Sequence, residues 1–392
     1  MTARALLLVL DGTGVGAMPD APVGERAAHT VASVLAAAAP ALPALRALGL
    51  GRLLPQPEPV PPGARAGRVA LAHAGADTYL GHNELLGALP PPPRPARVRE
   101  VADRLCAALA AAGFAPEPIA GGGALWLEPG LVVADNLEAR PGNAVNLSGS
   151  LDAMPFADME RAAAAVRAAL AVSRVIVLGA PGIDPRHLRD AVVRRGDETG
   201  IATARAGLYR EGYVVRHLGL ALDGRSQLPS RVAAAGGAVR LVGKVADLAA
   251  PTPPAVVRTP AVDTASVLAA VDGAWAQVAG PGGLVCATVQ ETDLAGHAED
   301  AHRFARVLAQ VDAWLGARLD RLGPEDLVVV TADHGNDPRL GSGHTREYAP
   351  VLCAGAPACL PGEGDGLTAV GAMVARHLAL PARTPSAAGA GQ

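Results

Sequence analysis

An apolar segment in the C-terminal part of the chain runs directly into side chains that could bind a metal ion. Residues 327–330 (LVVV) precede Asp333 and His334, and His344 follows ten positions further on. Carboxylate and imidazole groups together suit Zn²⁺ or Mn²⁺. Because strand ends at the edge of a sheet commonly carry the chemistry of an α/β protein, these three side chains are candidate metal ligands.

Two other apolar segments, far away in the sequence, end in the same way. Residues 5–10 precede Asp11 and a Gly-rich turn, and residues 284–289 precede Asp293, with His297 four positions later. Side chains at i and i+4 of a helical turn point the same way, so this Asp/His pair can reach one ion. A capped strand end with a solvated histidine would explain one such segment, but not three. Six ligands are too many for one tetrahedral ion and suit two ions about 4 Å apart, an arrangement that catalyses displacement at phosphorus.

A fourth segment contains a candidate nucleophile. Residues 75–87 read GADTYLGHNELLG, with Thr78 just before a glycine turn. A threonine hydroxyl is a weak nucleophile at neutral pH unless a base or a metal activates it, which two divalent ions would do. Most threonines in turns only cap the backbone, so this assignment depends on the ligands found elsewhere. His82 and Glu84, which follow in the same segment, are expected to brace the turn.

Together, the four segments resemble the alkaline phosphatase superfamily and, within it, the phosphopentomutases. The matching stretches are VLDGTGVGAMPDA, GADTYLGHNELLG, VGKVADL and TADHGNDP…GHTREYAP, in the order that the family shows. The resemblance covers roughly residues 1–90 and 224–380, with a weaker match between them. The last pattern is long and specific, unlike a short generic glycine motif.

The resemblance implies a role for each candidate residue. It implies two divalent ions, best assigned as Mn²⁺, with Zn²⁺ or Mg²⁺ as alternatives. The first ion would be held by Asp11, Asp333 and His334. The second would be held by Asp293, His297 and His344. Thr78 would carry the phosphoryl group during transfer.

The chain also departs from the phosphopentomutase pattern. The spacing from Asp293 to His297 is four positions, where the family usually has five, and four is closer to the cofactor-independent phosphoglycerate mutases. Where the family tends to have Ser-Ala-Asp, with a carboxylate that touches the sugar, this chain has Ser148-Gly149-Ser150. Asp152 is the nearest candidate substitute. We therefore expect the metal chemistry to be preserved and leave the identity of the sugar open.

Basic residues are candidates for binding the substrate. Among the 34 Lys and Arg residues, Lys244 is the only lysine, and it follows an apolar run at a position where the family also has a lysine. The stretch TARAGLYREGYVVRHLG contains Arg205, Arg210 and Arg216. Guanidinium groups bind phosphate in a bidentate way, and the resemblance favours Arg210. The alternative for these arginines is a solvated basic face. Arg346 is a weaker candidate.

Composition restricts the partners and the compartment. The formal net charge is −3, and no block of basic residues indicates binding to nucleic acid or to a membrane surface. No apolar stretch reaches the length of a membrane span, and the N-terminal ALLLVL is too short for a signal peptide. The four cysteines lack CxxC spacing, which is typical of free thiols in a reducing compartment. We therefore expect a cytoplasmic enzyme.

The distribution of proline and of apolar runs predicts the domain organisation. Residues 89–97, LPPPPRPAR, read as a stiff extended connection. Strands and helices alternate on both sides of it, with helices expected near 228–236, 262–278 and 299–321. This alternation predicts an α/β fold with a mostly parallel sheet sandwiched by helices, as in the alkaline-phosphatase-like core. Because the ligands come from both outer segments, residues 1–89 and 223–392 should form one discontinuous catalytic core, with 90–222 as an inserted α/β cap domain.

These observations predict a phosphomutase that acts on a small phosphorylated sugar. The preferred substrate is ribose or deoxyribose 1-phosphate, converted to the 5-phosphate through a phosphothreonine and a bisphosphate intermediate. A metal-dependent phosphatase or phosphodiesterase would use the same threonine and ions, with water as the acceptor. A third interpretation is a non-catalytic metal-binding protein. Such a protein would not require six ligands and a threonine at strand ends.

Overall fold

The chain folds into two compact units. The computed structural model describes residues 2–88, 91–203, 205–250, 253, 255–355 and 359–381. One unit combines Met1–Leu89 with Leu222–Gln392, and the other is Pro90–Ala221. The second junction falls one residue before the expected position. The first unit contains all six predicted metal ligands together with the threonine, whereas the candidate phosphate-binding residues Arg205, Arg210 and Arg216 belong to the second.

In its described residues, the first unit contains a seven-stranded, mostly parallel sheet, as predicted. The strand order is β12-β11-β13-β1-β14-β15-β2. The parallel strands are β1 (Arg4–Leu10), β11 (Ala238–Gly243), β12 (Val256–Thr259), β13 (Gly283–Val289) and β14 (Asp326–Thr331). The two antiparallel strands at one edge are β15 (Ala349–Gly355) and β2 (Arg65–Val69). Strands β13 and β14 are buried along their whole length, which is why they read as continuous apolar runs in the sequence.

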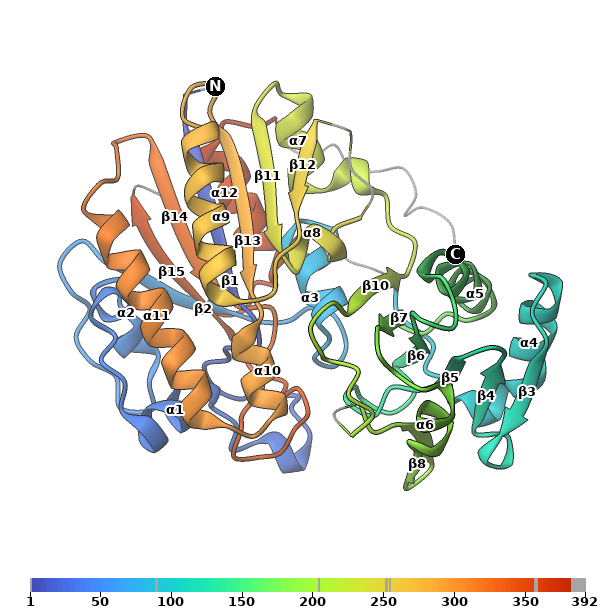
Figure 1. Cartoon of the computed structure of the whole chain (residues 1–392). Helices are drawn as coiled ribbons and strands as arrows, with labels where there is room; N and C mark the ends of the chain where they lie inside the picture. Colours follow the sequence, from blue (N-terminus) through green and yellow to red (C-terminus); the bar gives the residue numbers. More distant parts are fainter. Residues whose placement is uncertain are drawn as a thin grey trace, which may run out of the picture. The chain divides into compact units, whose positions relative to one another are not determined.

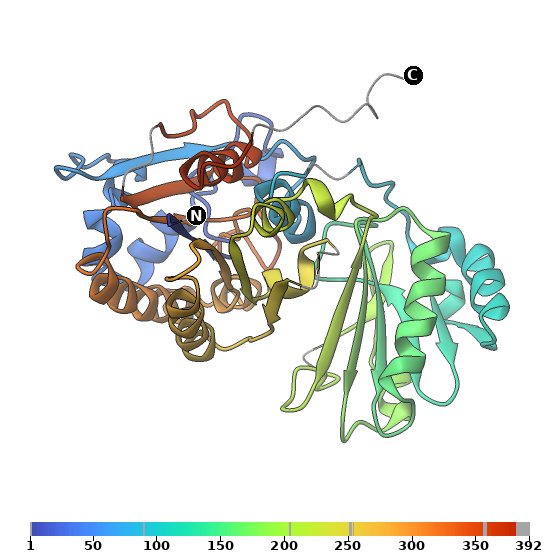
Figure 2. The ribbon, with the colours of Figure 1, turned by 90° about the horizontal axis from the view of Figure 1, so that it is seen from above.

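Helices cover both faces of this sheet (Figures 1 and 2). One face carries α1 (Thr30–Ala38), α2 (Pro43–Ala47), α9 (Thr264–Gln277) and α11 (Ala301–Leu319). The other carries α3 (Thr78–Leu85), α7 (Leu228–Ala234) and α12 (Thr368–His377). Helices α7, α9 and α11 confirm the three predicted helices to within two residues at each end. The amphipathic faces of these helices and the strands between them share one apolar core.

Strand register fixes the level at which the central strands end. Val9 of β1 pairs with Thr288 of β13 on one side and with Thr331 of β14 on the other. Since the three strands are parallel and in step, the residues that follow them emerge at the same edge of the sheet. The edge that receives Asp11 therefore also receives the loops after β13 and β14.

The second unit has a sheet of its own. Its described residues form six strands in the order β10-β7-β6-β5-β4-β3, of which only β6 and β7 run parallel. The strands are β3 (Pro116–Ile119), β4 (Ala124–Leu127), β5 (Leu131–Asp135), β6 (Ala144–Ser150), β7 (Arg174–Ala180) and β10 (Val214–Gly219). Helices α4 (Val98–Ala111) and α5 (Phe156–Ala169) pack with it around one apolar cluster, and α6 (Pro185–Asp190) lies by a second. The hairpin of β8 (Val192–Arg195) and β9 (Glu198–Ile201) completes the unit.

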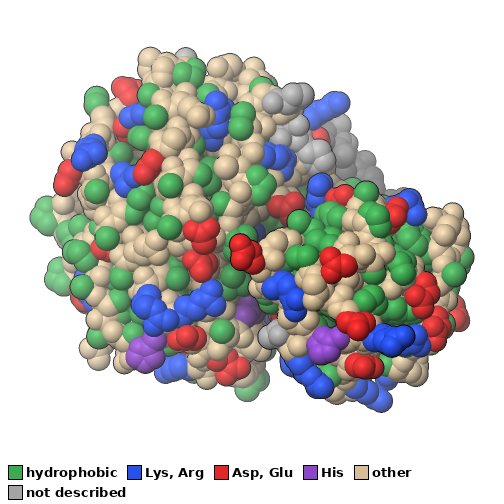
Figure 3. Space-filling model, in the orientation of Figure 1, with side chains coloured by type: hydrophobic (Ala, Val, Ile, Leu, Met, Phe, Trp, Pro, Cys, Tyr) green, Lys and Arg blue, Asp and Glu red, His purple; other side chains and the backbone are tan. Residues whose placement is uncertain are grey.

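The surface is mixed in charge. Acidic and basic side chains are interspersed over the face shown in Figure 3, in keeping with the small net charge. Within the ranges that the structure describes, no helix combines the length and the apolar character needed to cross a membrane.

The core of the first unit can be tested at Phe304 of α11, a fully buried aromatic side chain. We expect Phe304→Ala to lower the free energy of unfolding of this unit by about 3–5 kcal/mol, because the change leaves a cavity that the helix and the sheet cannot close. Leu340→Ala is the matched control, since Leu340 is 41% exposed, and it should cost less than about 0.5 kcal/mol. Urea unfolding followed by circular dichroism measures both, and equal losses would contradict this packing.

Candidate active site

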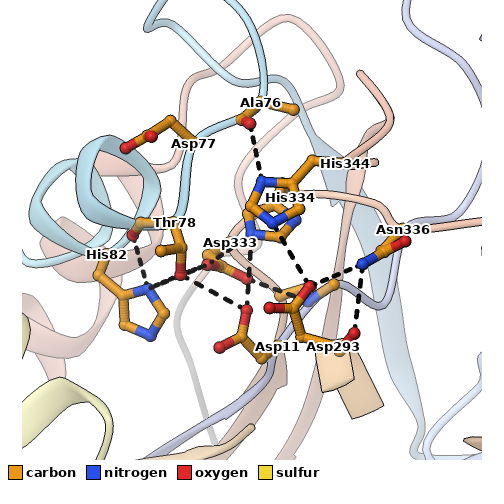
Figure 4. Close-up of polar contacts among 12 residues, drawn as sticks. Asp11, Ala76, Asp77, Thr78, His82, Asp293, Asp333, His334, Asn336 and His344 are labelled. Carbon is orange, nitrogen blue, oxygen red and sulfur yellow. Dashed lines mark hydrogen bonds and ion pairs between the residues drawn. The ribbon is translucent and has the colours of Figure 1, made fainter. Parts of the chain in front are cut away.

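Three buried aspartates meet at the carboxyl edge of the central sheet (Figure 4). Asp11 follows β1, Asp333 follows β14, and Asp293 lies in the short helix α10 (Glu291–His297) after β13. Gly12 lets the chain turn here: its φ is +69°, and a Cβ would lie 3.0 Å from the Asn336 Cβ. The Gly12 amide donates to Asp333 Oδ1 at 3.2 Å, which ties two of the loops together.

His334 lies between the first two carboxylates. Its Nε2 is 3.2 Å from Asp333 Oδ2 and 3.5 Å from Asp11 Oδ1. This nitrogen is buried and has no hydrogen-bond partner among the described residues. Asp11, Asp333 and His334, predicted as one ligand set, are thus brought together with their donor atoms facing one another.

The second predicted ligand set is also assembled. His297 Nε2 lies 3.3 Å from Asp293 Oδ2, and His344 Nε2 lies 3.6 Å from Asp293 Oδ1. The two Nε2 atoms are 3.3 Å apart. The His344 ring stacks on the His334 ring with centroids 3.8 Å apart, so the two sets of side chains are in contact.

All three histidines have the ring orientation expected of metal ligands. Nδ1 of His297 is 2.7 Å from the Ser342 carbonyl oxygen, and Nδ1 of His344 is 3.0 Å from that of Ala76. The Nδ1 of His334 is 3.1 Å from the Gly335 carbonyl oxygen. A carbonyl oxygen can only accept, so each Nδ1 donates its proton and each Nε2 can offer a lone pair. Such outer hydrogen bonds orient ligating histidines, and the donor set therefore fits divalent ions.

Grouping the donor atoms by distance alone gives sets that differ from the two ligand sets implied by the resemblance. Among the described residues, the donor atoms of Asp293, His334 and His344 lie within 4.8 Å of one another. A second group within the same distance consists of Asp11, His82 and Asp333. His334 is therefore near both sets, and His82 joins the cluster as a residue to which sequence reasoning gave only a bracing role.

Burial and neighbouring charges shift the pKa values of the three aspartates. Burial raises the pKa of Asp11 to about 6, with the negative charge of Asp333 adding to the rise and Lys244 opposing it. Burial also acts to raise the pKa of Asp293, but His297 and Lys244 outweigh it and hold that pKa well below its usual range. The same holds for the pKa of Asp333, where His334 and His82 outweigh burial.

Lys244 contacts two of the predicted ligand carboxylates directly. It follows β11 and precedes α8 (Val245–Leu248), and its Nζ lies 2.7 Å from Asp11 Oδ2 and 3.3 Å from Asp293 Oδ2. Burial lowers the pKa of Lys244, but the nearby carboxylates, Asp11 first, outweigh it and raise that pKa above its usual value. The sequence predicted Lys244 as a substrate-binding residue, and that role stays a prediction. Its contacts with the ligands were not foreseen.

Thr78 lies inside this cluster. It is the first residue of α3, whose N-cap Asp77 accepts from the Leu80 amide at 3.0 Å. The Thr78 hydroxyl donates to Asp333 Oδ2 at 2.7 Å and lies 3.5 Å from Asp11 Oδ1. The helix can approach this closely because Gly81 lacks a side chain: a Cβ there would be 2.5 Å from the Asp333 carbonyl oxygen.

The segment before Thr78 is held from two sides. The Glu84 carboxylate accepts from the Ala72 and His73 amides at 3.0 and 3.1 Å, which supports the predicted bracing role. Arg346 donates to the carbonyl oxygens of Leu71 and His73 at 3.1 and 2.9 Å. The structure therefore uses Arg346, predicted as a weak phosphate-binding candidate, to fix this segment.

Asn336 is a site residue that sequence reasoning left without a role. Its Nδ2 donates to Asp293 Oδ1 at 2.9 Å and approaches the Asp293 carbonyl oxygen at 3.3 Å. The side chain is fully buried. Its position two residues after His334, within the DHGNDP stretch, was the available signal.

The predicted substrate-binding arginines and Asp152 are described within the second unit. Arg205 is exposed. Arg210 donates from Nε to the Gly207 carbonyl oxygen at 2.8 Å and from Nη1 to that of Gly182 at 2.6 Å, so its guanidinium joins two loops. Asp152 accepts from the Gly182 amide at 2.6 Å.

Comparison with known proteins identifies the family. The model of the metalloenzyme superfamily matches residues 3–382. A phosphopentomutase from Methylobacterium nodulans is 33% identical over 418 residues, covering 97% of this chain and 98% of that protein. A phosphopentomutase from Symbiobacterium thermophilum is 31% identical, covering 96% of this chain and 95% of that protein.

The chain also resembles solved structures at lower identity. The structure of Leishmania mexicana phosphoglycerate mutase covers 98% of this chain and 97% of its own with 13% identity and a TM-score of 0.44, which is too low to support a conclusion. The family model and the relatives suffice: the chain belongs to the metalloenzyme superfamily of the alkaline phosphatases and, within it, to the family of these phosphopentomutases.

Proposed function

We propose that the protein is a phosphopentomutase, which interconverts the 1-phosphate and the 5-phosphate of ribose or deoxyribose. Relatives named phosphopentomutase are 27–34% identical over nearly the whole chain. The observation that carries the proposal is the Thr78 hydroxyl, which points at Asp333 Oδ2 from inside a buried cluster of carboxylates and imidazoles. A protein that only bound metal would not need a hydroxyl there.

The same residues would hold two divalent ions, which we assign as Mn²⁺. Asp11, Asp333 and His334 would bind the first, and Asp293, His297 and His344 the second. Two observations support this assignment. The Nδ1 atom of each histidine bonds a backbone carbonyl oxygen, which leaves Nε2 as the atom that would bind an ion, and the carboxylates are buried close together. When bound, the ions would lower the pKa of the Thr78 hydroxyl and neutralise charge on the transferring phosphoryl group.

The reaction would proceed in two matching halves. In the first, the bond between phosphorus and Thr78 Oγ breaks, a bond to the free sugar hydroxyl forms, and the proton of that hydroxyl passes to Thr78 Oγ. The bisphosphate then presents its other phosphate, and the same exchange in reverse returns a phosphoryl group to Thr78. The contact from Thr78 Oγ1 to Asp333 Oδ2 orients the hydroxyl for this return.

Two further expectations belong to this proposal. We propose that residues 90–222 act as a cap and supply Arg205 and Arg210 for the non-reacting phosphate, since guanidinium groups bind phosphate by paired hydrogen bonds. We also propose a cytoplasmic location. All four cysteines, each within the described ranges, are free thiols, as is usual in a reducing compartment.

Metal counting tests the ligand assignment. We expect two divalent ions per chain in the wild type, and about one in His344→Ala or Asp333→Asn, because each change removes a ligand from one set. Turnover should be abolished in both variants. His302→Ala, on the exposed face of α11, should keep both ions and full activity. Elemental analysis after dialysis gives the count, and a single ion in an active wild type would refute the two-ion site.

Ion binding should depend on pH through Asp11. Because its pKa is about 6, the carboxyl holds a proton below that pH, and an incoming ion has to displace it. We therefore expect the Mn²⁺ affinity to fall at least about tenfold per pH unit below about pH 6 and to be steadier above it. Calorimetric titration at about pH 5, 6, 7 and 8 measures this dependence. An affinity unchanged from pH 5 to 8 would show that Asp11 is ionised throughout.

The state of Thr78 separates a mutase from a phosphatase. A mutase needs a phosphoryl group to donate, so a fraction of the purified protein should be heavier by one phosphoryl group, located on the Thr78 peptide. A sugar bisphosphate should increase this fraction and the isomerase activity together. Thr78→Ala should lose both, whereas Thr78→Ser should keep part of each. If the wild type releases inorganic phosphate faster than it isomerises pentose phosphates, the phosphatase alternative is correct.

A further inference from the structure

The nucleophile segment is linked to the central sheet by His82, a histidine outside the two predicted ligand sets. His82 lies one helical turn after Thr78 in α3, so both side chains leave the same side of the helix. Its Nδ1 is 2.8 Å from the Thr78 carbonyl oxygen, 3.0 Å from Asp333 Oδ2 and 3.3 Å from Thr78 Oγ1. The imidazole therefore touches both the hydroxyl and the carboxylate to which that hydroxyl donates (Figure 4).

The other side of the ring is fixed by Thr288. The His82 Nε2 is 2.9 Å from Thr288 Oγ1, and both side chains are fully buried. Thr288 lies in β13, one of the two strands that flank β1, and its backbone is paired on both sides, with Val9 and with Gly243. Since a strand held on both sides cannot shift without breaking the sheet, Thr288 is a rigid anchor for a ring carried by a short helix.

The hydrogen-bond chemistry gives this ring a defined direction. The Thr78 carbonyl oxygen can only accept, so Nδ1 carries a proton whether the ring is neutral or charged. This single N–H is nearest the Thr78 carbonyl oxygen and Asp333 Oδ2, the carboxylate oxygen to which the Thr78 hydroxyl donates, and Thr78 Oγ1 lies further away at 3.3 Å. If Thr288 did not hold Nε2, the ring could rotate about its side-chain bonds, and the N–H would move away from the Thr78 carbonyl oxygen and Asp333.

We propose that Thr288 and His82 are positioning residues that orient the nucleophile: Thr288 fixes the His82 ring, and the ring N–H holds the Thr78 backbone and the Asp333 carboxylate to which the Thr78 hydroxyl donates. This proposal rests on the assignment of Thr78 as the group that carries the phosphoryl group. It adds to that assignment Thr288, a residue of the central sheet whose side chain hydrogen-bonds His82.

Two strands offer a matched pair of variants. Thr288 of β13 and Thr331 of β14 lie on either side of Val9 at the same level of the sheet, and both are fully buried. Within the described ranges, the hydrogen bond of the Thr331 hydroxyl goes to the Ala332 carbonyl oxygen at 3.4 Å. Thr288→Val removes the bond to His82 at nearly constant volume, Thr288→Ser keeps it, and Thr331→Val makes the same chemical change without touching His82.

The experiment compares these variants in the metal-loaded enzyme. Thr288→Val should lower kcat for pentose phosphate isomerisation about tenfold, the effect of losing one orienting hydrogen bond, with KM and ion content unchanged. Thr288→Ser and Thr331→Val should stay within about twofold of the wild type. In ¹⁵N-histidine-labelled protein, the His82 Nε2 signal should move in Thr288→Val and stay in place in Thr331→Val.

The possible results distinguish a failure of this proposal from a failure of the proposed function. Wild-type kcat in Thr288→Val would overturn the proposal, as would an equal loss in Thr331→Val, which would trace the effect to general packing of the strands. A loss of ions in Thr288→Val would overturn it as well. If the wild type does not isomerise pentose phosphates, the proposed function fails. The His82 nitrogen signals and the phosphorylation of Thr78 then still decide whether Thr288 positions the nucleophile.

Discussion

Three aspartates buried at one sheet edge impose the main physical constraint on this molecule. Carboxylates removed from water and placed side by side repel each other, and the rise of the Asp11 pKa to about 6 expresses that cost. Lys244, at 2.7 Å from Asp11, and the surrounding imidazoles offset part of it. Such a cluster is stable only with compensating positive charge, which explains why so many rigid elements converge on it.

The sheet meets this constraint through strand register. Parallel pairing of β1 with β13 and β14 brings three loops from distant parts of the chain to one level, so that each aspartate needs only a short loop to reach the others. Close backbone approaches then fix the loops. Gly12 and Gly81 occupy places where a Cβ would collide with neighbouring loops, and Asn336 holds Asp293 by its side-chain amide. The positions of the predicted ligands are thus set by the central sheet rather than by flexible loops.

The threonine is positioned by elements outside the ligand set. Glu84 and Arg346 form hydrogen bonds with the backbone of the segment before α3, and Asp77 caps the helix. His344 donates to the Ala76 carbonyl oxygen, which joins a ligand to the residue two positions before Thr78. The predicted metal ligands and the predicted nucleophile therefore share one hydrogen-bonded framework, and a change in either is expected to alter the position of the other.

The sequence by itself determined which residues could do the chemistry. Asp or His after an apolar run indicates a strand end whatever the rest of the fold, and the mostly parallel sheet followed from buried strands alternating with helices. Tertiary structure alone decided how these residues meet. Lys244 lies on Asp11 and Asp293, His82 reaches from Thr78 to Thr288, and Arg346 holds a backbone segment. These contacts join residues far apart in the chain, and they depend on strand register and helix approach, which the pattern of a single segment does not contain.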